Sequence, residues 1–149
     1  MYKHILLPTD GSPLSLKAAR EAAHLAKSMK AKITAVYVVP PFQPPYDGDG
    51  VAFAAREFSP QVHEARHERF ANDAFAKIEA AAARSRVKVA RLKVTGPAPW
   101  RSIIDSARAK KCDVIVMASH GRGGIGTLLL GSETNKVLAH SKTPVLVCR

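Results

Sequence analysis

The sequence predicts an α/β protein built on one doubly wound, five-stranded parallel sheet, with strand order 3-2-1-4-5 and helices on both faces. Three observations predict it. Strand-like and helix-like segments alternate along the chain, which favours a parallel sheet covered by crossover helices. Five of the segments are short enough for strands. The 149 residues, 46% of them hydrophobic, are enough for one domain over residues 1–149 with a sizeable core.

The first half of the chain predicts two strands and two helices. Residues 3–8 ("KHILLP") and 32–39 ("KITAVYVV") are typical of strands. Between them, residues 12–30 carry alanine and leucine at helical spacing, with Ser12 suited to the N-cap and Pro13 to the first turn. Residues 40–50 are too rich in proline and glycine for regular structure. A long helix is expected over about 59–84, with a buried stripe of Ala71, Ala74, Phe75, Ile78, Ala81 and Ala82.

The second half predicts three strands and two helices. A charged strand is expected over 86–94, a helix over 97–111 with Pro97 or Pro99 at its start, and a fully buried strand over 113–119. Residues 121–130 are expected to form a loop, 132–141 a helix, and 144–149 the last strand. No internal repeat or domain linker interrupts this alternation.

Composition narrows the classes of partner. The formal net charge is +11, but the basic residues are spread along the sequence and no aromatic residues alternate with them, so nucleic acid is not an expected partner. No apolar run approaches the roughly 20 residues that span a bilayer, and the first residues do not resemble a signal peptide. We therefore expect a soluble, cytoplasmic protein without membrane contact. Cys112 and Cys148 border apolar runs and are expected to be buried thiols.

A ligand site is expected where the winding of the sheet reverses, beyond the carboxyl ends of the first and fourth strands. These ends carry "PTDGS" and "ASHGRGG", the two stretches richest in small and polar residues. Asp10 could accept a hydrogen bond from a ribose hydroxyl or a base amine, or serve only to cap the next helix. Gly11 allows the chain to turn there.

Residues 117–138 resemble a phosphate cradle in two parts. Gly121, Gly123, Gly124 and Gly126 permit close backbone approach, and Arg122 supplies a cation. Gly131 and Ser132 then open a helix whose first amides form an anion site. The G-x-G-x-x-G from Gly121 to Gly126 is not a dinucleotide fingerprint, because it follows the fourth strand and no acidic residue ends the next one. A P-loop motif is absent from the sequence.

These residues resemble the universal stress protein (UspA) family. "ILLPTDGS", "DVIVMASHGRGG", "LLLGSETNKVL" and "TPVLV" are similar to that family's blocks, in their order and spacing. The resemblance implies an adenine-nucleotide alpha-hydrolase-like fold and a homodimer. In the family's nucleotide-binding motif, G-x2-G-x9-G-[ST], the second and third glycines fall on Gly121 and Gly131, followed by Ser132.

The resemblance also implies the site residues. Asp10 would contact the nucleoside, the backbone of Val38 would meet the adenine edge, and Pro8 and Thr9 would shape the pocket wall. The remaining residues would surround the phosphates or complete the pocket: Met117, Ala118, His120, Gly121, Arg122, Gly124, Gly131, Ser132, Glu133 and Thr134. The implied ligand is ATP or another adenine nucleotide, and Mg²⁺ as its companion is left open.

Two departures leave two hypotheses. Ala118 stands where the motif has its first glycine, and Glu133 places a carboxylate beside the expected phosphates. The first hypothesis is a nucleotide-binding stress sensor or regulator, with room for an unidentified regulatory protein partner. The alternative is a dimeric interaction module that binds no nucleotide. No residue is a convincing general base, and His120 is expected to be structural, so we expect no dedicated enzyme and at most slow, incidental ATP hydrolysis.

Two further patterns need interpretation. His63, Glu64 and His67 form an H-E-x-x-H, but the third ligand expected of a zinc protease is missing, so we reject a metallopeptidase and expect no metal site. The last strand, Pro144 to Cys148, would lie at a sheet edge without charge, whereas the other edge carries Arg86, Lys88, Arg91 and Lys93. An uncharged edge favours pairing, so a homodimer through Pro144–Cys148 is predicted.

Overall fold

The computed structural model describes residues 1–44, 59–121 and 130–149. Its strands are β1 (His4–Pro8), β2 (Lys32–Val39), β3 (Val89–Thr95), β4 (Val114–Ala118) and β5 (Val145–Cys148). They form one parallel sheet in the order β3-β2-β1-β4-β5, which confirms the predicted fold class. β1 and β4 are therefore the neighbours at which the winding reverses.

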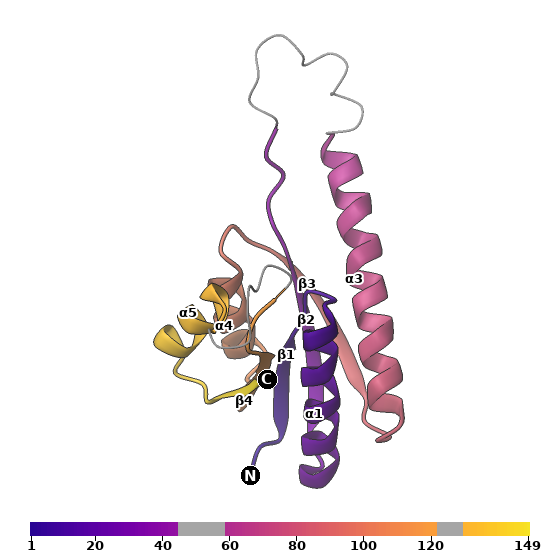
Figure 1. The fold of residues 1–149 in the computed structure, drawn as a ribbon, viewed down its shortest axis with the longest axis vertical. Coiled ribbons are helices and arrows are strands. Elements are labelled where there is room, and N and C mark those ends of the chain that lie inside the picture. Colours follow the sequence, from indigo (N-terminus) through magenta and orange to yellow (C-terminus); the bar gives the residue numbers. More distant parts are fainter. Residues whose placement is uncertain (45–58, 122–129) are drawn as a thin grey trace.

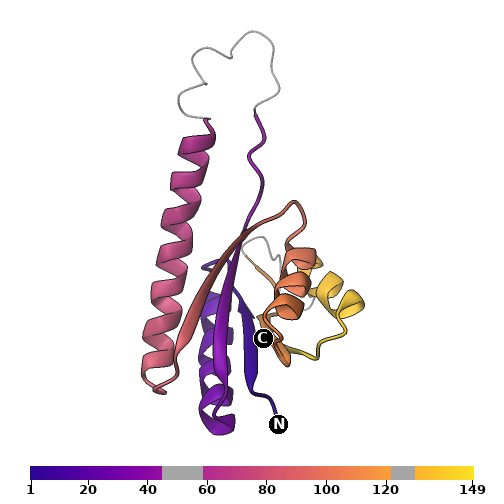
Figure 2. The same cartoon turned by 180° about the vertical axis from the view of Figure 1, so that it is seen from behind.

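Helices cover both faces of this sheet, as Figures 1 and 2 show. The helices α1 (Pro13–Met29) and α3 (Pro60–Ala83) pack on one face, and α4 (Pro99–Ala109) and α5 (Ser132–His140) pack on the other. None of the helices in the described ranges is both long and apolar enough to cross a membrane.

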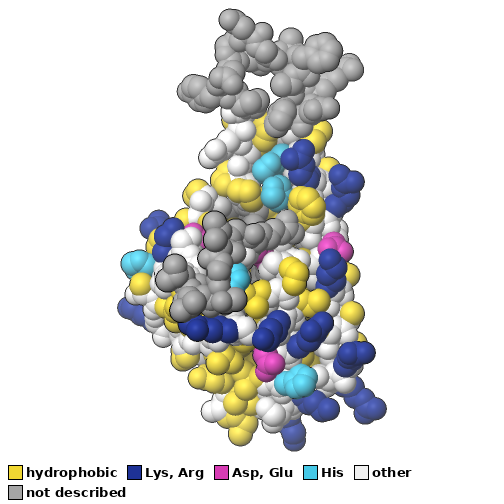
Figure 3. Space-filling model, viewed as in Figure 1, with side chains coloured by type: hydrophobic (Ala, Val, Ile, Leu, Met, Phe, Trp, Pro, Cys, Tyr) yellow, Lys and Arg dark blue, Asp and Glu magenta, His cyan; other side chains and the backbone are white. Residues whose placement is uncertain are grey.

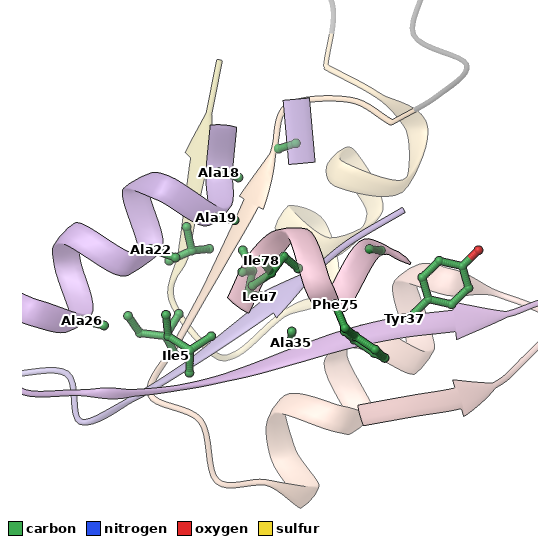
Figure 4. Close-up of a cluster of buried hydrophobic side chains, with 14 of the residues drawn as sticks. Ile5, Leu7, Ala18, Ala19, Ala22, Ala26, Ala35, Tyr37, Phe75 and Ile78 are labelled. Atoms are coloured by element: carbon green, nitrogen blue, oxygen red, sulfur yellow. The ribbon is translucent and has the colours of Figure 1, made fainter. Parts of the chain in front are cut away.

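The core has two layers, one on each side of the sheet. On the side of α1, the small residues Ala18, Ala22 and Ala26 let the helix lie close to Ile5 and Leu7, while Phe75 and Ile78 fill the space under α3 (Figure 4). On the other side, Ile103 and Ala107 of α4 and Val137 of α5 are buried. They pack on Leu6, Val36 and Ile115 of the sheet. Burying one such large aliphatic side chain contributes about 1.5–3 kcal/mol.

Most predicted boundaries agree with the structure, and the differences have local causes. β3 begins at Val89 rather than 86, because Arg86 has a φ of 56° and is still part of the turn after α3. α4 begins at Pro99, one of the two predicted starts, two residues after the predicted bound of 97. Ser12 caps α1 as predicted, accepting the Ser15 amide at 3.2 Å. Ala81 of the predicted α3 stripe is half-buried rather than buried, and residues 45–50 of the predicted loop lie outside the described residues.

The two cysteines are buried and free, as predicted. Burial raises the pKa of the Cys112 thiol to about 11 and also raises the pKa of Cys148. Both thiols therefore stay protonated near neutral pH and serve as small apolar groups of the core.

Candidate functional site

A crevice opens between β1 and β4 because their pairing stops early. The register joins only Ile5 with Val114 and Leu6 with Ile115. On the other side of β1, the Thr9 amide donates to the Val36 carbonyl of β2 at 2.9 Å. Since backbone groups alternate along a strand, residue 8 faces β4, and Pro8 has no amide to donate. Proline at this position therefore ends the β1–β4 ladder and lets the strands separate.

The separated strand ends line a cavity of about 420 Å³, within the usual size range of small-molecule sites. It brings together twelve of the fourteen site residues expected from sequence: Pro8, Thr9, Asp10, Val38, Met117, Ala118, His120, Gly121, Gly131, Ser132, Glu133 and Thr134. The other two, Arg122 and Gly124, lie outside the described residues. The cavity therefore collects predicted residues from β1, β2, β4 and α5.

Asp10 faces the crevice and also organises the turn after β1. Its Oδ1 accepts the Ser12 amide at 2.9 Å, and Gly11 bends the chain with a φ of 76°. From the opposite side, Gly121 approaches so closely that a Cβ there would lie 2.7 Å from Asp10 Oδ2. Asp10 thus orders the turn that leads into α1 and lines the cavity, and a Cβ at residue 121 would displace its carboxylate.

Val38 contributes its backbone amide and carbonyl to the crevice, not its side chain. The Val36 carbonyl faces β1, so by alternation the amide and carbonyl of Val38 face the same way. β1 ends at Pro8, opposite Val36, and the Gly11 amide bonds to Thr9 Oγ1 at 3.1 Å instead of continuing a ladder. The Val38 backbone groups are therefore directed into the crevice, a donor and an acceptor side by side.

The N-terminus of α5 forms the opposite wall. Gly131 is its N-cap and provides no side-chain hydrogen bond, so the amides of the first turn are not capped from within the helix. The Gly131 amide donates to the Ser119 carbonyl at 2.8 Å, and a Cβ on Gly131 would lie 3.0 Å from His120 Cα. The missing side chain lets α5 lie directly against the chain that leaves β4.

Ala118 and Thr134 join β4 to α5. The Thr134 hydroxyl donates to the Ala118 carbonyl at 3.0 Å, so its one proton is used within the protein. A contact from Thr134 to an anion would therefore come from its backbone amide. Ala118 is the last residue of β4 and has the extended backbone of a strand, which a Cβ tolerates. The departure from the family's glycine at 118 does not require a strained backbone.

Glu133 directs its carboxylate along the mouth of the cavity toward α4. Oε2 accepts the Trp100 amide at 2.8 Å, at the start of α4, and Oε1 accepts from Lys136 Nζ at 3.2 Å. A carboxylate at a helix N-terminus stabilises that helix. Glu133 thus caps α4 from α5, and its charge is partly compensated. Among the described residues that line the cavity, Asp10 and Glu133 are negatively charged, and none is a lysine or an arginine.

Sequence reasoning missed five lining residues: Ser15, Val36, Tyr37, Pro99 and Ile103. Val36 and Tyr37 could have been included, because they precede Val38 on the strand that ends at the crevice. Ile103 and Pro99 come from α4, whose placement beside this cavity has no local sequence signal. His120 is in the cavity as predicted, and its Nδ1 bonds to the neighbouring Ser119 Oγ at 3.1 Å.

His63 and His67 lie on α3 and line no part of this cavity. Their ring centroids are 4.5 Å apart, and His63 Nε2 bonds to the Pro40 carbonyl at 2.8 Å. Among residues 1–44, 59–121 and 130–149, no group of three or more His, Cys, Asp and Glu side chains is arranged to hold a metal ion. The pair therefore connects α3 to the segment after β2.

Comparisons with family models and with known proteins lead to the same family. The model of the universal stress protein family matches residues 1–149. A universal stress protein of Methanocaldococcus jannaschii is 34% identical over 151 residues, covering 100% of this chain and 83% of that protein.

Two solved structures extend the likeness to the fold. The universal stress protein UspA from Lactobacillus plantarum has a TM-score of 0.80 at 27% identity, covering 99% of this chain and 98% of that one. A universal stress protein in complex with cAMP has a TM-score of 0.69 at 25% identity, covering 99% of this chain and 97% of that one.

Proposed function

The chain belongs to the universal stress protein family, and on that premise we propose that its crevice binds an adenine nucleotide, with ATP as the ligand. One observation carries this proposal: a cavity of about 420 Å³ lies at the reversal of the sheet, between the Val38 backbone and the N-terminus of α5. The relative that is solved with cAMP supports an adenine nucleotide as the ligand class.

The adenine ring fits the apolar part of the cavity. Val36, Ile103 and Met117 offer flat apolar contacts. The amide of Val38 can donate to a ring nitrogen of adenine, and its carbonyl can accept from the exocyclic amine. Guanine has the opposite donor and acceptor pattern on that edge, so this backbone pair favours adenine.

The ribose and phosphates fit the polar part. Asp10 lines the cavity, and its carboxylate would accept from a ribose hydroxyl. Ser132, Glu133 and Thr134 of the first turn of α5 line the cavity, and the uncapped amides of a helix N-terminus favour an anion there. Mg²⁺ is proposed only as a companion of the phosphates, without a protein ligand set.

We assign this binding a sensing or regulatory role rather than a catalytic one. Both carboxylates of the described lining accept backbone amides, Asp10 from Ser12 and Glu133 from Trp100. Neither is placed as an unengaged base that could activate water, and His120 bonds to its neighbour Ser119. Hydrolysis of bound ATP would therefore be slow and incidental.

Nucleotide retention tests the proposal. Protein purified without added nucleotide and then denatured should release an adenine nucleotide, identified by chromatography. Asp10→Asn keeps the acceptor for the Ser12 amide but removes the charge, and it should release less. Asp105→Asn, on the exposed side of α4, is the matched control and should release as much as the unmodified chain. Release of none, together with no binding of added ATP, would favour the alternative, an interaction module without a nucleotide.

A further inference from the structure

The end of the sheet opposite the crevice carries a row of lysines. One lysine lies at or just before the start of each strand: across the sheet from β3 to β5 these are Lys88, Lys32, Lys3, Lys111 and Lys142. We call these five lysines the basic row. The register places Lys88 level with Lys32, and both near Lys3. All five side chains are exposed.

More cations surround the basic row, and little negative charge balances them. Lys30, Arg84, Arg86 and Lys110 lie in the same helix-to-strand turns. The acidic residue of these turns is Asp113, whose Oδ2 already accepts the Lys3 and His4 amides at 2.7 and 2.8 Å. These two bonds lower the pKa of Asp113 and hold it charged.

The ion pairs of the described residues lie elsewhere. Lys93 pairs with Glu64 and Glu68, and Arg91 pairs with Glu79, so β3 is neutralised along its exposed face by α3. No lysine of the basic row takes part in an ion pair within the described residues. In Figure 3, dark blue side chains lie along the right side and the lower part of the face formed by α1 and α3. Within the described residues, the basic row therefore keeps its charge without a carboxylate partner.

Backbone strain supports a role for these cations. In the described residues, three side-chain-bearing residues have positive φ: Lys30 (55°), Arg86 (56°) and Lys111 (53°). Each follows a helix, at a position where glycine is common because it adopts positive φ without strain. A positive charge near the C-terminus of a helix is favoured by the helix dipole, which explains part of the preference for lysine or arginine at these three positions. The helix dipole does not explain the lysines at positions 3, 32 and 88, because Lys3, Lys32 and Lys88 precede or begin strands.

From this arrangement we propose that the basic row docks the phosphate backbone of double-stranded nucleic acid, without sequence preference. Neighbouring strands are about 4.8 Å apart, so the row spans roughly 19 Å. That is long enough to cross a major groove of about 12 Å and reach phosphates on both strands. Lysine is a point charge without base-reading geometry, which predicts sequence-independent binding.

Two observations select a duplex over other polyanions. Proteins that bind single-stranded nucleic acid stack its bases on aromatic side chains. Tyr2, which is next to Lys3, packs against the core instead. A linear row also suits a linear polyanion better than a planar membrane surface. The sequence-based expectation against nucleic acid rested on cations spread along the chain. The parallel fold changes that argument, because every helix-to-strand turn brings its cations to the same end.

The experiment measures binding of a short, fluorescently labelled DNA duplex of mixed sequence by anisotropy as a function of salt. Neutralising four or five phosphates predicts a fall in affinity of roughly 100- to 500-fold between 50 and 200 mM salt. The row variant carries Lys3→Gln, Lys32→Gln, Lys88→Gln and Lys111→Gln. The control carries Lys17→Gln, Arg20→Gln, Arg66→Gln and Arg69→Gln, which removes equal charge from exposed positions of α1 and α3. Circular dichroism verifies that both variants are folded.

The proposal expects the row variant to lose more than about tenfold in affinity and to show a shallower salt dependence, while the control changes little. Equal losses in both variants would overturn it, because net charge alone would then explain binding. Absence of duplex binding by the unmodified chain at 50 mM salt would also overturn it. Vesicles containing phosphatidylserine are titrated in parallel, and binding to them without binding to DNA would assign the row to a membrane surface instead.

Discussion

At the residue scale, the crevice depends on groups that are absent as much as on groups that are present. Pro8 lacks the amide that would continue the β1–β4 ladder, and Gly121 lacks the Cβ that would meet Asp10. The sequence indicated Gly121 from its residue type, and the family resemblance implied Pro8 at the pocket wall. The sequence did not reveal that Thr134 and Glu133 use their side chains within the protein, because those bonds depend on where α4 and α5 pack.

Gly131→Val should weaken adenine-nucleotide binding by more than about tenfold. Its Cβ would lie 3.0 Å from His120 Cα and 3.1 Å from His120 Cβ, so α5 must move away from β4 and take its first-turn amides with it. Ala118→Gly is the control, since it restores the family's motif and should leave affinity unchanged or raise it. Unchanged affinity in Gly131→Val, measured by calorimetry, would refute the assignment of this wall to the phosphates.

His4 should make stability depend on pH between about 5 and 7. Its ring is buried and bonds to Thr34 Oγ1 at 2.8 Å, and burial, with the nearby Lys32 charge, lowers its pKa below the usual 6.5. Below pH 6.5 the unfolded chain therefore binds more protons than the native state, and the free energy of unfolding falls as pH drops. The slope from this group is at most about 1.4 kcal/mol per pH unit.

Denaturant unfolding of the unmodified chain and of His4→Gln tests this dependence. Glutamine can still bond to Thr34 but does not titrate, so the variant should have a flatter profile between pH 5 and 7. The lowered pKa of Asp113 acts in another window, since its contribution to stability is lost only as pH falls below about 4. An unchanged slope in His4→Gln would show that His4 is not the titrating group.

At the scale of elements, the sequence predicted the number, type and order of the strands well. The reason is physical: fully buried strands such as β4 need continuous apolar runs, and helix starts such as that of α1 need a cap such as Ser12. Boundaries at turns were less predictable. Arg86 adopts a left-handed conformation that favours glycine, so nothing in its residue type indicates that β3 starts only at Val89. The α4 wall of the cavity was missed because packing between helices has no local pattern.

The exposed edge of β5 predicts a homodimer through residues Pro144 to Cys148. Ile115 and Ser119 donate their amides to the carbonyls of Pro144 and Cys148, so by alternation the amide of Val147 faces the open edge. Val147→Pro should therefore weaken the dimer while leaving the β4–β5 ladder intact. Val147→Ala keeps the amide and should remain dimeric. Sedimentation that finds the unmodified chain monomeric at micromolar concentration, or Val147→Pro still fully dimeric, would rule out this edge.

At the scale of the whole molecule, the parallel sheet separates two sites. All strands are parallel, so they end at the side of the sheet that holds the crevice and begin at the side that holds the basic row, and the two ligands proposed would bind at opposite ends of one core. The sequence alone could place the crevice, because its residues lie in two recognisable stretches. It could not place the basic row, because that row is assembled from the residues before β1 and from four helix-to-strand turns, and only the topology brings these segments together.

The most direct test of the central claim is a calorimetric titration of the nucleotide-free chain with ATP, ADP and AMP, with GTP as the control for the base. We predict saturable binding of ATP at a ratio of one per chain with a micromolar dissociation constant. We also predict at least about tenfold weaker binding of GTP, because the donor and acceptor of Val38 suit adenine alone. No heat with any adenine nucleotide, or equal affinity for ATP and GTP, would contradict adenine recognition by this crevice.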